Sequence, residues 1–345
     1  MGGISWGGEI KEIGCTMKEN MHRAWRCHAF GDYHDLKLES VPQPLPGPGQ
    51  VLVRVRALAP GFPDMLMVQG LYQLKPALPF TPCAEFAGEV VALGAEANSF
   101  AVGDAVLGSV RFGAAAEYVV ADASACQALP TEYDWGLGAA FTVAFKTAYV
   151  GLVTRGHLQP NETLLVHGAS GGVGLAAAQL GANLGARVIA TASGAAKVNA
   201  LHELGVAEVI DLTRGGFREE VKSLTGGRGV DVVFDPVGGD VFDESLRCVA
   251  PFARVLLIGF AGGRIPELKV NMALIKQLSI IGVRAGEYGR LNPEGGAEVD
   301  RALRDLMLTG RVQPHVCARL PFENLPEAFD RIAARTVVGR LILER

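Results

Sequence analysis

The sequence lacks the features that mark nucleic-acid-binding, secreted or membrane-spanning proteins. Lys and Arg number 32 against 36 Asp and Glu, and the net charge of −4 gives no electrostatic basis for binding nucleic acid or an anionic membrane. No apolar run is long enough to cross a bilayer, and the N-terminus has no hydrophobic signal-peptide core. We therefore expect the main partner to be a small molecule.

Cysteine is scarce and shows no pairing pattern. The six cysteines are widely spaced and none forms a CxxC pair, which is typical of free thiols in a reducing compartment. The sequence therefore predicts a cytoplasmic protein. The cysteines are Cys15, Cys27, Cys83, Cys126, Cys248 and Cys317.

Glycine, by contrast, is abundant. The 44 glycines in 345 residues exceed the average share of about 7% and are dispersed, which indicates many tight turns rather than low complexity. The length suffices for two domains. Residues 1–20 are weakly patterned, and we expect a disordered extension or a misassigned start, since Met21 opens a better first strand.

One stretch combines a strand, a glycine-rich turn and a helix. Residues 164–167 predict a buried parallel strand, and residues 175–184 predict a helix that ends at Gly185. In such a unit, the bare turn and the positive end of the helix dipole bind a diphosphate. Alanine replaces the first glycine of GxGxxG, but the flanking strand and helix supply the context that the motif requires. The predicted cofactor-binding residues here are Ala169, Ser170, Gly171, Gly172, Val173 and Gly174.

The predicted secondary structure divides the chain into two units. Short strands with turns fill the N-terminal part, which indicates a β-rich, barrel-like unit. Strands then alternate with helices, which indicates a doubly wound parallel sheet. We predict an α/β protein in which residues 21–133 and 285–345 form one discontinuous domain and residues 134–284 form a Rossmann dinucleotide-binding domain. The expected elements are a hairpin over 24–38, strands 51–57, 86–93, 102–107, 116–121, 164–167, 187–191, 208–210, 230–234, 254–258, 279–283 and 340–343, and helices 63–70, 135–152, 175–184, 197–204, 217–224, 241–248, 300–308 and 326–334.

The residues after the second parallel strand favour NADPH over NADH. A site for NADH usually carries Asp or Glu about 20 residues past the glycines, to bind the ribose 2′-hydroxyl. The strand at 187–191 is followed instead by Ser193 and, one turn later, Lys197. A hydroxyl and a cation suit a 2′-phosphate. Gly259 and Phe260 follow a later strand, where they are predicted to line the nicotinamide cleft.

Further motifs carry a resemblance to a known family. They are residues 166–174, Asp64 with residues 70–72, residues 78–80, residues 85–88, Gly103 with Asp104, and residues 235–239. From about residue 23 onward, the chain resembles the medium-chain dehydrogenase/reductase superfamily, specifically its zinc-free quinone oxidoreductase (ζ-crystallin-like) branch. The resemblance implies a GroES-like catalytic domain, NADPH and a homodimer. It also implies that Thr147 lies beside the nicotinamide and Arg335 near the adenosine phosphate.

The same resemblance bears on the metal and on the pocket. The positions that hold zinc ligands in zinc-dependent relatives are here Gly61, Ala84 and about Val143, and none of these side chains can bind zinc. The resemblance therefore implies a site without metal. Two positions depart from the branch, because many relatives have Asn at Gly61 and Tyr at Leu212. The departure at Gly61 leaves the identity of the substrate open, and the departure at Leu212 weakens the predicted preference for NADPH.

We expect hydride transfer from NADPH to a quinone, which needs proximity more than a Lewis acid. Tyr72 is the predicted residue of the substrate pocket, where its hydroxyl would stabilise a nascent oxyanion. The alternative on the same fold is an enoyl- or acryloyl-CoA reductase, or an alkenal (enone) reductase. A nucleotide-dependent RNA-binding protein is a further alternative, which the charge disfavours.

Overall fold

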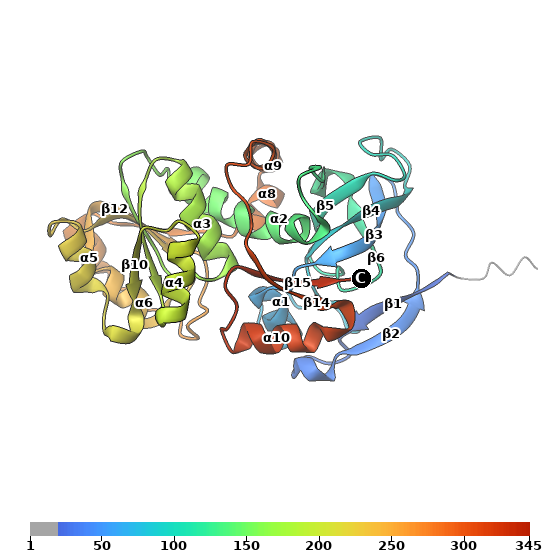
Figure 1. Ribbon diagram of the computed structural model, residues 1–345, viewed down its shortest axis with the longest axis horizontal. Coiled ribbons are helices and arrows are strands. Elements are labelled where there is room, and N and C mark those ends of the chain that lie inside the picture. Colours follow the sequence, from blue (N-terminus) through green and yellow to red (C-terminus); the bar gives the residue numbers. More distant parts are fainter. Residues whose placement is uncertain (1–19) are drawn as a thin grey trace, which may run out of the picture.

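The computed structural model describes residues 20–345, and these form two lobes side by side (Figure 1). The disordered extension predicted for residues 1–20 lies almost wholly outside the described residues, as does Cys15. One of the two lobes, called the parallel-sheet lobe, contains a six-stranded parallel sheet in the order β10-β9-β8-β11-β12-β13. Helices cover this sheet, as expected for a doubly wound α/β arrangement. Its elements are β8 (Thr163–Val166), α3 (Gly172–Asn183), β9 (Arg187–Ala192), α4 (Ala195–Glu203), β10 (Glu208–Asp211), α5 (Arg218–Leu224), β11 (Val230–Asp235), α6 (Gly239–Ser245), β12 (Val249–Leu257), α7 (Val270–Lys276) and β13 (Ser279–Gly282).

The other lobe, called the β-rich lobe, contains a seven-stranded sheet in the order β14-β15-β3-β4-β5-β7, with β6 paired to β3. Strands β14 and β15 come from the C-terminal part of the chain, so both ends of the described chain build this lobe. A separate antiparallel hairpin, β1 with β2, lies beside it. Its elements are β1 (Met21–Arg26), β2 (Lys37–Pro42), β3 (Gln50–Leu58), α1 (Phe62–Val68), β4 (Glu85–Leu93), β5 (Ala105–Ser109), β6 (Tyr118–Asp122), β7 (Cys126–Ala128), β14 (Val316–Pro321), α10 (Leu325–Ala333) and β15 (Arg340–Glu344).

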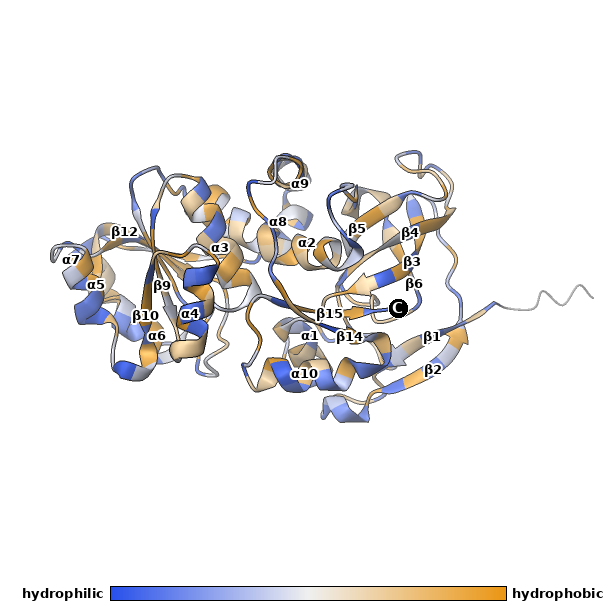
Figure 2. Cartoon of the chain, viewed as in Figure 1, coloured by the Kyte–Doolittle hydropathy of each residue, from blue (hydrophilic) through white to orange (hydrophobic). Residues whose placement is uncertain are grey.

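Helix α2 (Trp135–Tyr149) runs between the lobes and packs against β4 and β5 on one side and α3 on the other. With the π-helical segment after it, Trp135–Arg155 is apolar and long enough to cross a membrane by length and composition. The prediction that no apolar run is long enough was therefore wrong. Because 67% of its most apolar window is buried inside the protein, this segment serves here as a core helix. Figure 2 shows apolar residues concentrated along the strands and helices of the interior.

The strand and helix types predicted from the sequence recur in the structure, but some elements were missed. The missed elements include β7, β14, α7 and α8 (Ala285–Leu291). Strand β7 has only three residues, and α8 contains two glycines, which weaken a helical pattern. Helix α9 (Pro293–Leu308) begins seven residues before the expected start because Asn292 caps it and Pro293 opens it. The predicted domain boundaries stay predictions.

The predicted hairpin has different bounds. Residues 27–36, not the single turn at Gly31 and Asp32, separate β1 from β2, and a 3₁₀ turn, Tyr33–Asp35, lies within them. The sequence reasoning placed the turn at the Gly-Asp pair, whereas Asp32 caps the 3₁₀ turn by accepting the N–H of His34 at 2.9 Å. An aspartate before a turn often caps it in this way.

Candidate active site

The glycine turn between β8 and α3 leaves its backbone bare. Gly168 has φ +56°, a left-handed conformation that favours glycine, and Gly171 precedes the first residue of α3. A Cβ on Gly174 would lie 2.8 Å from the Cα of Ala169 and would overlap the carbonyl oxygen of Gly168. The first N–H groups of the helix have no intrahelical partner, so the turn fits a diphosphate. The sequence reasoning included Gly168 in the turn but not among the predicted cofactor-binding residues, although the turn requires a glycine there on conformational grounds.

The other residues predicted in this turn differ in what they present. Ala169 is fully buried, and its N–H donates to the carbonyl of Thr191 at 3.1 Å. Ser170 is also buried, and Val173 is half-buried against the core. Ala169 therefore connects the turn to the neighbouring strand β9 by a hydrogen bond, and the glycines are the residues that allow a diphosphate to approach the backbone.

The last strand of the β-rich lobe closes over this turn. The N–H of Gly339 donates to the carbonyl of Ser170 at 2.7 Å, and Gly339 forms an isolated parallel bridge with Gly171. The side chain of Arg340 then crosses Gly172, where an added Cβ would lie 3.2 Å from its Cγ. Arg340 therefore lies beside the predicted diphosphate site. Sequence reasoning missed this residue, although it directly follows the glycine before the final strand.

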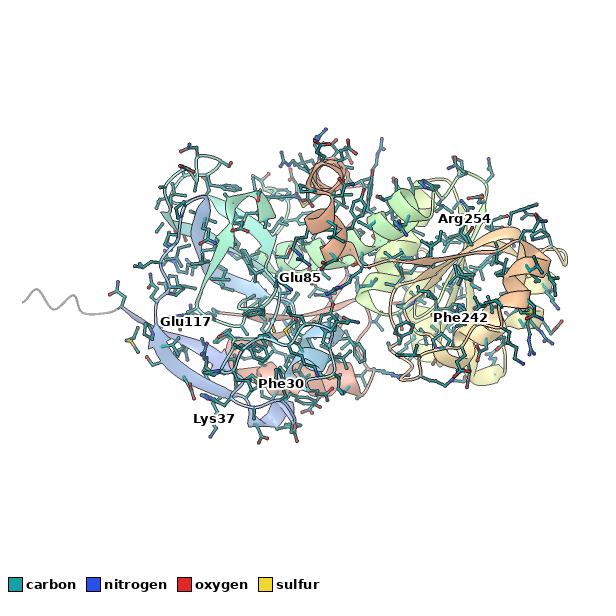
Figure 3. The ribbon with its side chains drawn as sticks, turned by 180° about the vertical axis from the view of Figure 1, so that it is seen from behind. Phe30, Lys37, Glu85, Glu117, Phe242 and Arg254 are labelled. Atoms are coloured by element: carbon teal, nitrogen blue, oxygen red, sulfur yellow. The ribbon has the colours of Figure 1, made fainter. Side chains whose placement is uncertain are left out.

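Arg340 also belongs to a buried charged cluster at the junction of the lobes. Its guanidinium pairs with Glu85, whose Oε1 accepts the N–H of Val143 at 2.6 Å. Asp64 caps α1 by accepting the N–H of Gly61 at 2.8 Å. Burial raises the pKa of Asp64 to about 7, with a further contribution from the charge of Glu85, and burial also raises the pKa of Glu85. Figure 3 shows Glu85 in the middle of the molecule.

The residues around this cluster do not fit a zinc ion. Gly61, Ala84 and Val143 occupy the positions of the zinc ligands, and they offer no side-chain nitrogen, oxygen or sulfur. Across residues 20–345, no three His, Cys, Asp or Glu side chains converge to hold a metal ion. An added Cβ on Gly61 would find only ordinary contacts, the guanidinium of Arg340 at 3.7 Å among them. We therefore derive no chemical step through zinc.

Two of the residues predicted to bind the adenosine phosphate come together. Lys197, on α4, is half-buried, and its pKa is lowered by burial and then by the positive charge of Arg335. Arg335 has φ +55° and donates to the carbonyl of Ala261 at 2.8 Å. Ser193 is exposed at the end of β9. Two neighbouring cations beside an exposed hydroxyl fit a phosphate dianion.

The structure also brings an acid to this end of the site. Asp211 comes from the end of β10, so it was not among the residues that follow β9 in the sequence. Its Oδ1 accepts the N–H of Gly194 at 2.8 Å, and it also accepts the N–H and hydroxyl of Thr213. These three donors occupy Oδ1 and hold the pKa of Asp211 below its usual range. The carboxylate therefore shapes the turn that carries Ser193.

The predicted nicotinamide end is formed by two neighbouring turns. Asp235 Oδ1 accepts the N–H groups of Val237 and Gly238, both at 2.8 Å. The ring of Phe260 packs on Gly238, where an added Cβ would lie 2.8 Å from the ring, and the N–H of Gly259 donates to the carbonyl of Asp235. These turns therefore form one packed unit at the carboxyl ends of β11 and β12.

Two further predicted residues lie apart from these turns in the sequence. Thr147 is half-buried in the last turns of α2, and Tyr72 is half-buried against the core of the β-rich lobe. Their roles beside the nicotinamide and the substrate stay predictions.

A lobe that closes over the glycine turn of a doubly wound sheet defines a dinucleotide-dependent dehydrogenase or reductase. The family model described as "Alcohol dehydrogenase GroES-like domain" matches residues 47–131, and the model described as "Zinc-binding dehydrogenase" matches residues 172–298. A "Quinone oxidoreductase-like protein 2 homolog" of Nematostella vectensis is 37% identical over 301 residues, which cover 86% of this chain and 82% of the relative.

Solved structures agree with this match. A mycobacterial protein complexed with NADPH is similar with a TM-score of 0.87 and 30% identity, covering 94% of this chain and 100% of that one. The CurF ER cyclopropanase from the curacin A biosynthetic pathway gives a TM-score of 0.85 and 26% identity, covering 94% of this chain and 99% of that one. The chain belongs to the medium-chain dehydrogenase/reductase superfamily, in its quinone oxidoreductase-like branch. The resemblance, the GroES-like and Rossmann fold and the assignment as an oxidoreductase are thereby confirmed.

Proposed function

We propose that this protein reduces quinones with NADPH and without a metal ion. The observation that carries the proposal is the bare glycine turn beside Arg340, which the neighbouring cations Lys197 and Arg335 and a lobe junction without zinc ligands accompany. The quinone oxidoreductase-like relative supports the choice of acceptor. A quinone accepts hydride readily once it is held against the nicotinamide, so positioning is the main task of the protein.

NADPH is the reductant in this proposal. The similar mycobacterial structure with NADPH and the pair Lys197 and Arg335 support it. When bound, NADPH supplies the hydride. The chain binds its diphosphate at the turn of residues 168–174, and Phe260 and Gly259 form a wall at the nicotinamide end. Tyr72 donates a hydrogen bond to the oxygen of the reduced acceptor, which stabilises its developing negative charge.

Steady-state kinetics test the proposal directly. We expect oxidation of NADPH with 1,4-benzoquinone and with 9,10-phenanthrenequinone, and slower turnover with NADH. Dialysis against a chelator leaves both rates unchanged, because no side chain at the three metal positions is a ligand. Absence of turnover with every quinone and conjugated carbonyl would exclude a reductase role, and loss of activity on chelation would exclude the metal-free route.

A second candidate is the reduction of an enoyl thioester or an enone on the same fold. The CurF ER cyclopropanase shares the fold over nearly the whole chain, so this fold is not confined to the reduction of quinones. Fold alone does not choose between acceptors. Parallel assays with crotonyl-CoA, an enone and the quinones above rank the candidates by kcat/KM, and the acceptor with the highest value identifies the chemistry.

We also propose that the protein is a homodimer through α7 and β13. Val270, Leu274 and Ile275 of α7 are 76%, 79% and 70% exposed, and β13 is an edge strand of the parallel sheet. Figure 2 shows α7 at the end of the molecule farthest from the β-rich lobe. Such an apolar patch next to a sheet edge suits a second copy related by a twofold axis. Light scattering is expected to show a dimer that Leu274→Glu dissociates and that Leu45→Glu, another exposed leucine, leaves intact.

The five cysteines among the described residues are free, and four of them are buried. This supports the proposal of a reducing, cytoplasmic environment. Cell fractionation tests it, and recovery of the protein from an oxidising compartment would contradict it.

A further inference from the structure

Two arginines pair with Glu287 at the start of and within α8, and the charge of a third, Arg111, acts on the same carboxylate. In α8, the guanidinium groups of Arg284 and Arg290 both pair with Glu287, the first at 3.6 Å. The hydrogen bond from Arg290 and the charges of Arg290, Arg284 and Arg111 hold the pKa of Glu287 below its usual value. Three positive charges therefore face one negative charge, and two positive charges remain without compensation in this group. Arg284 and Arg290 are also accessible, with side chains 51% and 52% exposed.

Both lobes contribute to this cluster. Arg284 follows Val283, whose N–H donates to the carbonyl of Leu257 at 3.0 Å, so Arg284 stands at the carboxyl ends of β12 and β13. That edge carries ligands in doubly wound sheets. Arg111 comes from the β-rich lobe and is exposed. It follows Val110, whose N–H donates to the carbonyl of Ala84 at 2.8 Å. Arg111 therefore directly follows a residue that contacts Ala84, at the junction of the lobes where the acceptor is expected to bind.

The cluster is too far from the cofactor phosphates to bind them. In the proposed binding mode, the adenosine phosphate lies at the end of β9, the diphosphate at β8 and the nicotinamide at β11 and β12, which are neighbours in the sheet order β10-β9-β8-β11-β12-β13. Strand β13 lies four positions from β9, which is about 19 Å at the usual spacing of about 4.8 Å between strands. The arginines at β13 therefore lie beyond the nicotinamide, on the acceptor side.

We propose that Arg111, Arg284 and Arg290 bind a phosphate or another anionic group on the hydride acceptor, so that charged acceptors are preferred over neutral ones. The inference rests on the proposed function and adds the charge of the substrate to it. A guanidinium binds phosphate and carboxylate through two parallel hydrogen bonds, and exposed arginines on two lobes suit an anionic group held near the junction of the lobes. An acyl thioester of coenzyme A carries such a group on its carrier, and a sulfonated quinone carries it on the ring.

Matched acceptors test the proposal. The first pair is crotonyl-4′-phosphopantetheine and crotonyl-pantetheine, which share the reacting group and the pantetheine arm and differ only in the phosphate. The second pair is 1,2-naphthoquinone-4-sulfonate and 1,2-naphthoquinone. We expect at least a tenfold higher kcat/KM for the charged member of one pair or both, and the pair that shows it identifies the source of the charge. We also expect this advantage to shrink as salt rises, because exposed charges are screened. Equal kcat/KM within both pairs overturns the proposal.

Variants separate binding from folding. Arg111→Ala is expected to lower kcat/KM for the preferred charged acceptor about tenfold and to leave its neutral counterpart unchanged, and Arg111→Lys is expected to recover part of the loss. Arg247→Ala, a change at another exposed arginine in the parallel-sheet lobe, is the matched control. The Kd for NADPH reports whether each variant has folded. An equal loss with both acceptors in Arg111→Ala, with the Kd for NADPH intact, overturns the proposal. Absence of turnover with every acceptor, the neutral quinone included, refutes the proposed function itself. Turnover of the neutral quinone without a preference for charged acceptors refutes only the role of the arginines.

Discussion

Removal of Lys197 tests how the protein would distinguish NADPH from NADH. Lys197 is half-buried beside Arg335, whose guanidinium donates to a backbone carbonyl, that of Ala261, and therefore keeps its charge uncompensated by that contact. Burial and the charge of Arg335 lower the pKa of Lys197, so the two cations repel each other until an anion lies between them. The 2′-phosphate of NADPH supplies that anion, and NADH has none.

The magnitude follows from the type of contact. A hydrogen bond between charged groups contributes about 1.5–3 kcal/mol, and about 1.4 kcal/mol corresponds to a factor of ten in affinity. We therefore expect Lys197→Ala to raise the Kd for NADPH by roughly 10- to 100-fold. The Kd for NADH should change little, because the lost charge faces no phosphate in that complex.

Fluorescence or calorimetric titration of both nucleotides measures the effect. Lys37→Ala is the matched control, because Lys37 lies on β2, on the side of the β-rich lobe that faces away from the parallel-sheet lobe (Figure 3). If Lys197→Ala weakens NADPH and NADH by the same factor, or leaves NADPH affinity within threefold of wild type, the assignment of the 2′-phosphate to this pair is wrong.

Three further predictions concern the cradle and the buried cluster. Gly174→Ala is expected to weaken both nucleotides at least tenfold, since its Cβ would displace the backbone at Gly168; unchanged Kd values would contradict the cradle. The pKa of Asp64, raised to about 7, exceeds its ordinary value of 3.8, so the native state holds a proton between these values and loses stability as the pH rises through them. Asp64→Asn should reduce this slope in urea unfolding between about pH 4 and 7, and an identical slope in the variant would refute the assignment. Glu85→Ala leaves Arg340 buried without its partner and should cost about 3–5 kcal/mol of unfolding free energy. The double variant Glu85→Leu with Arg340→Met should lose much less unfolding free energy, because it removes both charges. If it is as unstable as Glu85→Ala, an uncompensated charge on Arg340 is not the cause of the loss.

The sequence was most informative where a local rule constrains the backbone. The glycine turn was predicted because strand, turn and helix follow one another within about twenty residues, and the structure places Gly171 before the first residue of α3. Gly168 was predicted as part of the turn but not as a cofactor-binding residue, because the motif was aligned on Ala169, whereas the left-handed φ belongs to the residue before it. Helix α8 was missed because Gly286 and Gly289 interrupt its pattern.

Contacts between distant segments escaped the sequence. The approach of Gly339 to Ser170 joins residues 169 positions apart, and the pair Glu85 and Arg340 spans 255 positions. Asp211 lies near Ser193 only because β10 pairs with β9. No periodicity or motif encodes such a distance, so a single sequence carries no local signal for it.

The sequence by itself determined the kinds of element, the alternation of strands and helices in the parallel-sheet lobe and the glycine turn predicted to bind a diphosphate. These follow from hydrophobic periodicity and from the conformational freedom of glycine, which act over a few residues. Only the tertiary structure decided which charges meet at the junction of the lobes: Arg340 over Gly172, Asp64 buried near Glu85, and three arginines around Glu287. The reason is that burial and charge depend on which surfaces pack together, and the closure of two lobes sets that packing.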